Sequence, residues 1–356
     1  MTTEESNRIN QSGTRFTIVP RGAYSLAESG MFGRGERSGD WPGSGAYAPE
    51  EGVLRLAFLL DDLRTPVGVA LVQDGGGVHG TVSGLDPGGD VGPVRDQVAR
   101  MLSLDRDGAG FDAVGARDPQ VARLLAAAPG LRPPLFPSPY EAAVWCVIAQ
   151  RWGARQATAA RERLSREFGA VVDAGGVGTA VVPTPAQLLA AERLPGLPAV
   201  KQERLRAVAR AAGEGMFEPV AIRDGDPDEV RARLRQVNGI GGFAASLIHL
   251  RASGVTDALV DGEPRLAVLV GALYGLHGPA SPEDLAGIAE SWRPFRTWVA
   301  VLVRAAGRRL PELADLPEPA PAARCDPARP APGPARADRL SRVRPLRRPG
   351  SPARSG

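Results

Sequence analysis

The segment that most constrains the fold runs from Leu234 to Ile248 and reads LRQVNGIGGFAASLI. A Gly-Ile-Gly turn follows an apolar residue and precedes a helix with small residues in its first turn. The glycines let the backbone turn tightly, and unpaired N–H groups at the start of the next helix carry the positive end of its dipole, which suits a phosphate. The residues expected in this phosphate-binding hairpin are Gly239, Ile240, Gly241, Phe243 and Ala244. Taken alone, the pattern is equally compatible with a plain turn between two helices.

The chain of 356 residues, with 43% hydrophobic content, is long enough for two or three structural units. Residues 1–14 are polar, and residues 313–356 are rich in Pro, Ala and Arg with few large apolar side chains, so both segments are expected to be disordered. Between them we expect an α+β N-terminal domain over residues 15–130 and a helical core over residues 131–312.

Short apolar runs predict strands in the N-terminal domain. GVLRLAFLL, PVGVALVQD and VHGTVSG are separated by Gly-rich turns, which indicates a small antiparallel sheet. From Ser138 onward the spacing of apolar residues is helical, and Ser138-Pro139 with Glu141 has the residue types of a helix start. The predicted fold class is α+β, a small antiparallel sheet followed by an all-α core.

The positive charge is concentrated at the end of the chain. From residue 320 onward nine arginines stand against Asp326 and Asp338, although the whole chain carries only +3. The folded part is therefore net negative, and any binding of nucleic acid by it must depend on a local surface.

Cysteine and histidine give no support for metal chemistry. Cys146 and Cys325 lack ligand-like spacing, and the three histidines are scattered. We expect no metal site, no metal cluster and no cofactor. No apolar run approaches the ~20 residues of a membrane span, and the polar start lacks the apolar part of a secretory signal, so we expect a cytoplasmic protein without membrane contact.

Three ordered motifs together resemble one family. The hairpin segment is the pattern of a helix-hairpin-helix. Ser138–Trp152, SPYEAAVWCVIAQRW, is similar to the helix and loop that carry a Gln and a duplex-penetrating residue. Trp292–Trp298, WRPFRTW, looks like a C-terminal W-x-P-[WF]-R signature. Over residues 15–310 the chain resembles the helix-hairpin-helix DNA glycosylase superfamily, in particular the 3-methyladenine DNA glycosylase II (alkylated-base glycosylase) family.

The resemblance implies base flipping and hydrolysis of the N-glycosidic bond. A carboxylate near the sugar stabilises the developing positive charge or orients water, and Asp261 is the candidate for this catalytic role. It is alternatively a surface residue in an Asp-Gly turn. Glu263 is the other candidate acid, or a structural partner of Arg265.

Further roles follow from the same resemblance. The expected DNA wedge is Gln150, Arg151 and Trp152, with core packing as the alternative for Trp152. The expected pocket for a cationic base is aromatic, although each ring is individually compatible with core packing; it comprises Phe243, Trp145, Trp292 and Trp298, with Phe295 as a further candidate. The expected basic rim is Arg151, Arg155, Arg251 and Arg296.

The sequence also departs from the family pattern. Asn238 replaces the usual Pro before Gly-Ile-Gly, the tract LVDGEPRL lacks the residues that usually surround the aspartate, and Arg304 falls near the position of a stacking Trp in some relatives. A cation at that position repels a cationic base. Lys201 is the only lysine and lies outside the hairpin, so no lyase activity is expected.

We therefore expect a monofunctional glycosylase that removes alkylated bases and leaves an abasic site. It needs no cofactor, binds double-stranded DNA as a monomer, and is associated with the nucleoid if the source is a bacterium. A noncatalytic protein that binds damaged or distorted DNA is the alternative. An oxidised-base glycosylase is a weaker one, because it normally uses a lysine beside the hairpin.

Overall fold

The computed structural model describes residues 14–32, 44–259, 263–314 and 316. Residues 1–13 and the tail from residue 317 onward, which include most of the two segments expected to be disordered, lie outside the described residues.

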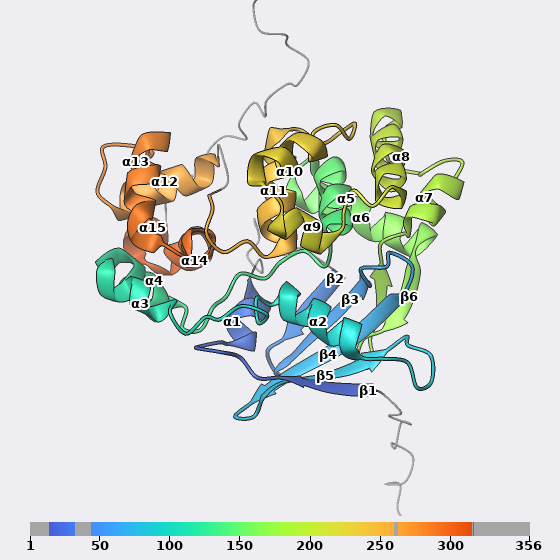
Figure 1. Cartoon of the computed structure of the whole chain (residues 1–356), viewed down its shortest axis with the longest axis horizontal. Helices are drawn as coiled ribbons and strands as arrows, with labels where there is room; N and C mark the ends of the chain where they lie inside the picture. Colours follow the sequence, from blue (N-terminus) through green and yellow to red (C-terminus); the bar gives the residue numbers. More distant parts are fainter. Residues whose placement is uncertain (1–13, 33–43, 260–262, 315, 317–356) are drawn as a thin grey trace, which may run out of the picture. The chain divides into compact units, whose positions relative to one another are not determined.

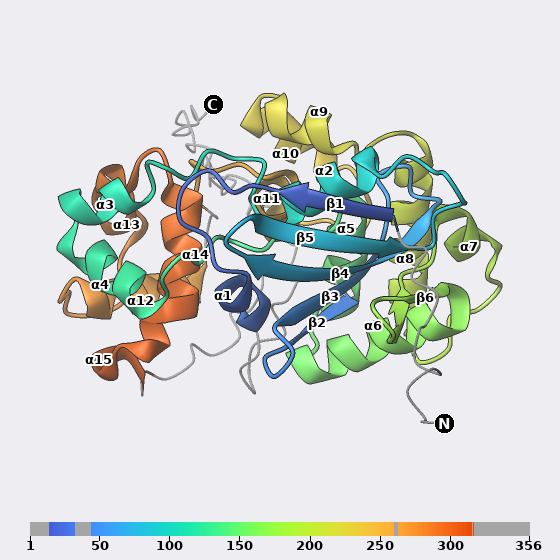
Figure 2. The same ribbon diagram turned by 90° about the horizontal axis from the view of Figure 1, so that it is seen from below.

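An antiparallel sheet forms the N-terminal part of the fold, with the strand order β1-β5-β4-β3-β2 (Figures 1 and 2). The predicted strands are confirmed as β3, β4 and β5, whereas β1 and β2 were not predicted. The strands are β1 Thr14–Ile18, β2 Ser44–Ala48, β3 Val53–Leu59, β4 Pro66–Asp74 and β5 Gly77–Ser83. The two unpredicted strands lie at the two edges of the sheet.

A second, two-stranded sheet interrupts the helical region. It consists of β6, Ala170–Asp173, and β7, Gly178–Val181, and it contacts β4 and β3. Gly68 of β4 permits this contact, because a Cβ there would lie 1.9 Å from the Asp173 carbonyl oxygen. The α+β class is confirmed, but the second part of the chain is not purely helical. The strands are too short for a clear sequence signal.

Helices make up most of the remaining structure, and the expected helical spacing from Ser138 onward is confirmed apart from the β6–β7 hairpin. In the first half of the chain they are α1 Leu26–Met31, α2 Gly92–Met101, α3 Asp112–Arg117, α4 Pro119–Ala127, α5 Pro139–Ala149 and α6 Ala154–Phe168. They continue as α7 Pro185–Ala190, α8 Ala199–Gly213, α9 Pro219–Asp224, α10 Pro227–Leu234, α11 Gly242–Ser253, α12 Pro264–Leu273, α13 Pro282–Ala289, α14 Arg296–Ala306 and α15 Pro311–Ala314. Short 3-10 turns follow α13 at Glu290–Trp292 and α14 at Gly307–Arg309.

The predicted start of α5 is confirmed in detail. The Ser138 hydroxyl accepts a hydrogen bond from the Glu141 N–H at 3.1 Å, and Pro139 occupies the first helical position. The helix ends at Ala149. The expected wedge residues therefore follow it, in the loop between α5 and α6.

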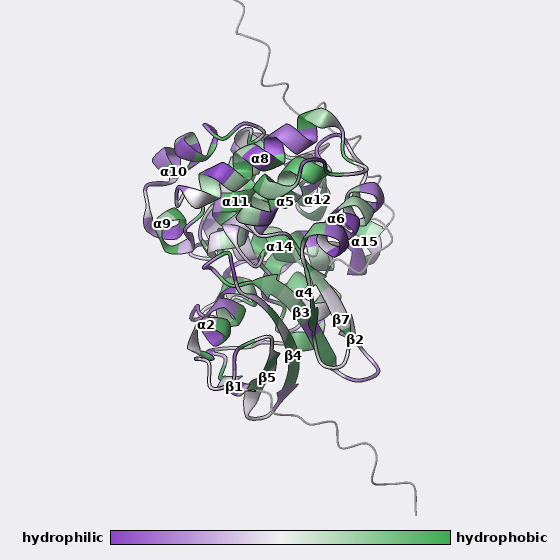
Figure 3. Ribbon diagram, turned by 90° about the vertical axis from the view of Figure 1, so that its right-hand side faces the viewer, coloured by the Kyte–Doolittle hydropathy of each residue, from purple (hydrophilic) through white to green (hydrophobic). Residues whose placement is uncertain are grey.

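Buried side chains fall into three groups. One lies between the sheet and α2, a second joins α5 to α11 with parts of β3 and β7, and a third joins α3 and α4 to α12–α15. Figure 3 shows the apolar colour along β3 and β4, and Figure 1 shows α4 next to α14, which it contacts. The expected domain boundary at residue 130 thus does not coincide with the grouping of buried side chains, because α3 and α4 share a core with the C-terminal helices.

Glu141 connects the sheet to the helices. Its carboxylate accepts a hydrogen bond from the Leu59 N–H of β3 at 3.2 Å and lies 3.4 Å from an Arg161 guanidinium nitrogen of α6. The side chain is fully buried, and burial raises its pKa from 4.5 to about 7 despite the nearby arginine.

We predict a pH-dependent contribution of Glu141 to stability. Because the folded-state pKa is raised, the folded protein holds a proton that unfolding releases between about pH 4.5 and 7, so the free energy of unfolding falls as pH rises. Glu141→Gln cannot ionise and lacks this dependence. Urea unfolding at pH 5 and pH 7.5 should show the wild type losing about 2 kcal/mol relative to the variant. A constant difference between the two proteins across this range would contradict the buried, protonated carboxyl.

Candidate nucleic-acid interface

The predicted hairpin joins α10 to α11. Its backbone closes through hydrogen bonds from Val237 N–H to the Leu234 carbonyl at 3.1 Å and from Ile240 N–H to the Val237 carbonyl at 3.0 Å. Ile240 is buried and anchors the turn in the core, while Gly239 has a φ of +98°, a conformation that strongly favours glycine. The sequence therefore folds into the tight hairpin that the glycines predict.

The N-terminus of α11 is open. Gly241 precedes the helix without a side-chain hydrogen bond to its first amides, and a Cβ at Gly241 or Gly242 would meet no atom within 4 Å. Phe243 is 44% exposed, whereas Ala244 is buried. Unpaired amides, the helix dipole and free space on the same side provide the elements of a phosphate site.

The second predicted DNA-contacting element is the loop 150–153, between α5 and α6. Arg151 is exposed and has a φ of +58°, which is uncommon for a residue with a side chain. Trp152 is partly buried against the core that contains α5, and its backbone N–H donates to the Ala149 carbonyl at 3.1 Å. The loop therefore presents Arg151 outward, whereas Trp152 is only partly available for contact with another molecule.

Gln150 joins this loop to the hairpin. Its side-chain Nε2 donates to the Gly239 carbonyl at 2.5 Å, and its Oε1 accepts from Arg204 Nη1 of α8 at 2.6 Å. The structure thus brings two of the predicted DNA-contacting elements together. The role of Arg204 was not predicted, because an arginine within a charged helix carries no sequence signal for it.

Several exposed arginines lie within these two loops or a few residues from them in the sequence. Arg151, Arg155, Arg233 and Arg235 are exposed, and within the described part of the chain their side chains have no acidic partner. The other two residues of the expected basic rim do not fit. Arg251 is buried, donating to the Pro134 carbonyl at 2.8 Å, and Arg296 is bound to Asp257 at 2.7 Å.

The expected aromatic pocket is not assembled as a group. Trp292 is fully buried, and its indole nitrogen donates to Asp118 at 3.3 Å and to Tyr274 at 3.1 Å. Trp298 is buried beside Phe295, with ring centroids 5.1 Å apart. Core packing, the alternative for each ring, accounts for these residues. Trp145 is partly buried in the core with α5, which leaves Phe243 as the exposed candidate.

The WRPFRTW signature has a structural role that the sequence did not reveal. Arg296 Nε donates to Asp257 at 2.7 Å, and the Thr297 hydroxyl donates to the Ala258 carbonyl at 2.7 Å while accepting from its N–H at 3.1 Å. The Thr297 N–H donates to the Thr256 carbonyl at 2.9 Å. The start of α14 therefore fixes the chain immediately before the tract that contains Asp261.

Asp261 itself lies outside the described residues. Glu263 begins the described chain again, just before α12, and its carboxylate forms an ion pair with Arg304 Nη1 of α14 at 3.0 Å. Both side chains are mostly buried. Arg304, whose charge was expected to repel a cationic base, thus has a carboxylate beside it. The partner of Glu263 that the structure shows is Arg304, whereas the sequence analysis had suggested Arg265.

Comparisons with known proteins find sequence similarity to DNA repair enzymes. No protein-family model matches the sequence. A Mycobacterium tuberculosis protein described as a probable bifunctional transcriptional activator/DNA repair enzyme AlkA is 32% identical over 218 residues, 60% of this chain and 42% of the relative. DNA-3-methyladenine glycosylase 2 of Escherichia coli is 28% identical over 182 residues, 50% of this chain and 61% of the relative.

Solved structures share the fold over a larger part of the chain. The 3-methyladenine DNA glycosylase of Archaeoglobus fulgidus matches with a TM-score of 0.67 at 20% identity, covering 83% of this chain and 98% of the other. An 8-oxoguanine glycosylase/lyase of Clostridium acetobutylicum matches with a TM-score of 0.59 at 13% identity, covering 82% and 99%. The chain is thus similar in sequence to proteins named for DNA repair and shares the fold of solved DNA glycosylases.

The sequence similarity covers only part of these relatives. The chain spans about half the length of the curated relatives it matches, 42% and 61%. In the described part of the chain, no helix is long and apolar enough to cross a membrane, and no group of three or more His, Cys, Asp or Glu residues is arranged to hold a metal ion.

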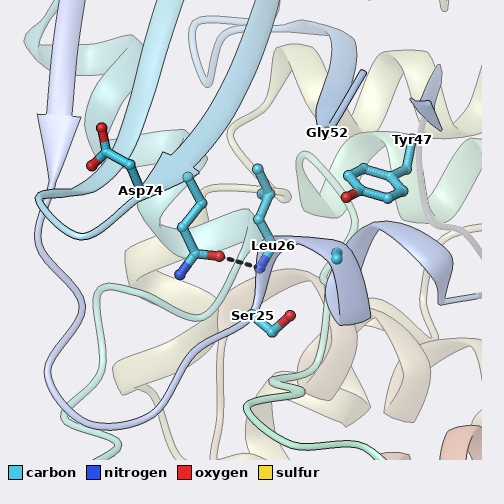
Figure 4. Close-up of a pocket in the computed structure, with 7 residues that line it drawn as sticks. Ser25, Leu26, Tyr47, Gly52 and Asp74 are labelled. Carbon is cyan, nitrogen blue, oxygen red and sulfur yellow. Dashed lines mark hydrogen bonds between the residues drawn. The ribbon is translucent and has the colours of Figure 1, made fainter. Parts of the chain in front are cut away.

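A surface cavity of about 390 Å³ lies on the N-terminal part of the fold (Figure 4). It is lined by Ser25, Leu26, Ala27, Tyr47, Gly52, Gln73 and Asp74. The Gln73 side chain accepts a hydrogen bond from the Leu26 N–H at 2.6 Å beside it, as the dashed line in Figure 4 shows. None of the residues that the sequence analysis assigned to DNA binding or catalysis lines this cavity.

We predict that the two hairpin glycines respond differently to the same substitution. Gly239→Ala should destabilise the protein by about 1–3 kcal/mol, because φ is +98° and the new Cβ would lie 2.8 to 2.9 Å from Arg204 side-chain atoms. Gly241→Ala should change stability by less than about 1 kcal/mol but weaken DNA binding, because its Cβ enters open space where a phosphate approaches. Urea unfolding and binding to a labelled duplex measure the two effects. Equal destabilisation by both variants would contradict the hairpin geometry.

Proposed function

We propose that this protein is a monofunctional DNA glycosylase that binds duplex DNA, turns an alkylated base of the 3-methyladenine type out of the helix and hydrolyses its N-glycosidic bond, leaving an abasic site. The observation that carries the proposal is the open N-terminus of α11, joined through Gln150 to the loop 150–153, in a chain with the fold of solved DNA glycosylases. Relatives named for DNA repair and for 3-methyladenine support the reaction type.

Binding would use the hairpin for position and the loop 150–153 for opening the duplex. Backbone amides that hold one phosphate fix the protein on DNA without reading sequence. Turning a nucleotide out costs a few kcal/mol, and stacking on an aromatic ring or a guanidinium in the vacated space contributes ~1–3 kcal/mol. Arg151 is the exposed candidate for this space, with Trp152 beside it and Phe243 as the candidate to contact the extruded base.

For the chemical step we propose Asp261 as the carboxylate near the sugar, with Glu263 as the alternative. Cleavage of the glycosidic bond places positive charge on the sugar, which a nearby carboxylate stabilises. The chain on both sides of Asp261 is held by α14, through Thr297 before it and Arg304 after it.

The proposal excludes a lyase step. A Schiff base requires a free amine beside the sugar. The amine of Lys201 donates to the Ile148 carbonyl at 2.5 Å and lies 3.4 Å from the centre of the Trp152 ring. It is therefore occupied by the protein itself, and the expected product is an intact strand with an abasic site.

The remaining parts of the proposal concern assembly and place of action. We propose that the protein acts as a monomer on double-stranded DNA, without a cofactor, in the cytoplasm and on the nucleoid, where such a substrate would be found. The alternative is a noncatalytic protein that binds damaged or distorted duplex through the same hairpin and loop.

We predict that Asp261→Asn abolishes release of free base from methylated duplex DNA while leaving DNA binding unchanged. The amide has the same shape but cannot stabilise the positive charge of the transition state, so the expected loss is at least about a hundredfold. Release is measured by chromatography of free bases under single-turnover conditions, without added metal.

Glu263→Gln is the matched control. It should retain base release but lose stability, because it leaves the mostly buried Arg304 without this carboxylate. Loss of release in Glu263→Gln but not in Asp261→Asn would move the carboxylate to Glu263. No release by the wild type, with DNA binding retained, would establish the noncatalytic alternative.

A further inference from the structure

Helix α8 lies outside the motifs that suggested DNA binding, yet it contacts both of the DNA-contacting loops. Lys201 and Arg204 are three residues apart on α8 and therefore lie on one face of the helix. Arg204 reaches the hairpin and the loop 150–153, and Lys201 reaches the end of α5 and Trp152. One helix face thus connects two loops that are distant in sequence.

Arg204, Gln150 and Gly239 form a closed set of contacts. Arg204 donates to Gln150 at 2.6 Å, Gln150 donates to the Gly239 carbonyl at 2.5 Å, and the Arg204 aliphatic chain packs on Gly239 so closely that a Cβ there would lie 2.8 to 2.9 Å away. The Gln150 side chain thus has both its amide nitrogen and its amide oxygen in hydrogen bonds. A shift of one loop relative to the other therefore breaks at least one hydrogen bond.

Lys201 fixes the other side of the loop 150–153. It is only 5% exposed, its amine donates to the carbonyl of Ile148 at the end of α5, and its charge lies over the Trp152 ring. The carbonyls of the last helical turn lack intrahelical partners, so an ammonium group satisfies one of them. Burial and the nearby Arg204 lower the pKa of Lys201 from 10.5 to about 8.

We propose that Lys201 and Arg204 are positioning residues that hold the loop 150–153 and the hairpin 238–241 as one rigid DNA-contacting unit, with Gln150 as the joint. The inference rests on the proposed function in that both loops contact DNA, but it does not require base release. In this unit the distance between the gripped phosphate and Arg151 is set by protein contacts before DNA is bound. Opening of the duplex is thereby coupled to phosphate binding.

The test compares binding of two duplexes that differ only in one position. One is undamaged, and the other carries a tetrahydrofuran abasic analogue, which has no base to release and is already unstacked. Arg204→Met should lower affinity for the abasic duplex about tenfold and affinity for the undamaged duplex only about twofold. Arg204→Lys, which keeps a donor for Gln150, should restore more than half of the preference. Arg210→Met, an exposed arginine of the same helix, should leave the preference unchanged.

Fluorescence of 2-aminopurine placed beside the abasic analogue separates positioning from general weakening. Under saturating protein, Arg204→Met should give less fluorescence increase than the wild type, because the duplex is opened less. An unchanged preference and an unchanged fluorescence increase in Arg204→Met would overturn the proposal. Absence of binding to both duplexes by the wild type would overturn the proposed function and the inference together, whereas absence of base release alone would affect only the former.

The single lysine supplies a measurement on the unaltered protein. Labelling with ¹³C-lysine gives one side-chain ε resonance, from Lys201, because the chain contains no other lysine. Its chemical shift should change more on addition of the abasic duplex than with the undamaged one, because the opened duplex lies closer to Trp152 and the Lys201 amine. In Arg204→Met the pKa of this amine should rise, because a neighbouring positive charge is removed. A resonance that is insensitive to both changes would also overturn the proposal.

Discussion

The hydrogen bond from Gln150 to the carbonyl of Gly239 connects the loop 150–153 to the hairpin, the two elements that we propose contact DNA. The hairpin alone is a turn with an open helix N-terminus, and the loop 150–153 alone is a link between two helices. Joined to each other and to α8 through Arg204, they form one surface that combines the open start of α11 with the exposed Arg151. A partly buried contact of this kind holds its geometry better than long exposed side chains do.

The order of the main strands and helices could be predicted from the sequence because the signals for them are local. Ser138-Pro139 marked the start of α5 through a capping hydroxyl and a proline with suitable φ, and the Gly-rich turn between β4 and β5 marked the hairpin of the sheet. The edge strands β1 and β2 and the short β6–β7 hairpin were missed. β1 pairs with the distant strand β5, and β2, β6 and β7 are only four or five residues long. A close approach such as that of β6 to Gly68 leaves no periodic pattern in the sequence.

The candidate site was only partly predictable for the same reason. The hairpin residues were found because two glycines and a helix start have a direct backbone meaning, whereas the aromatic residues were chosen by type, and type does not separate a core ring from a pocket ring. Trp292 is held by Asp118, a residue 174 positions earlier, and Arg251 lies in the core rather than on a basic rim. Lys201, Arg204 and Thr297 act through contacts between distant segments, which one sequence does not reveal.

Amide hydrogen exchange with and without a duplex that carries an abasic analogue reports both loops in one experiment. We expect slowed exchange to appear together at residues 239–245 and 150–154, since one surface would hold the phosphate and the opened base pair. Slowed exchange confined to the arginine-rich tail, or to the N-terminal sheet, with both loops unchanged would contradict this expectation.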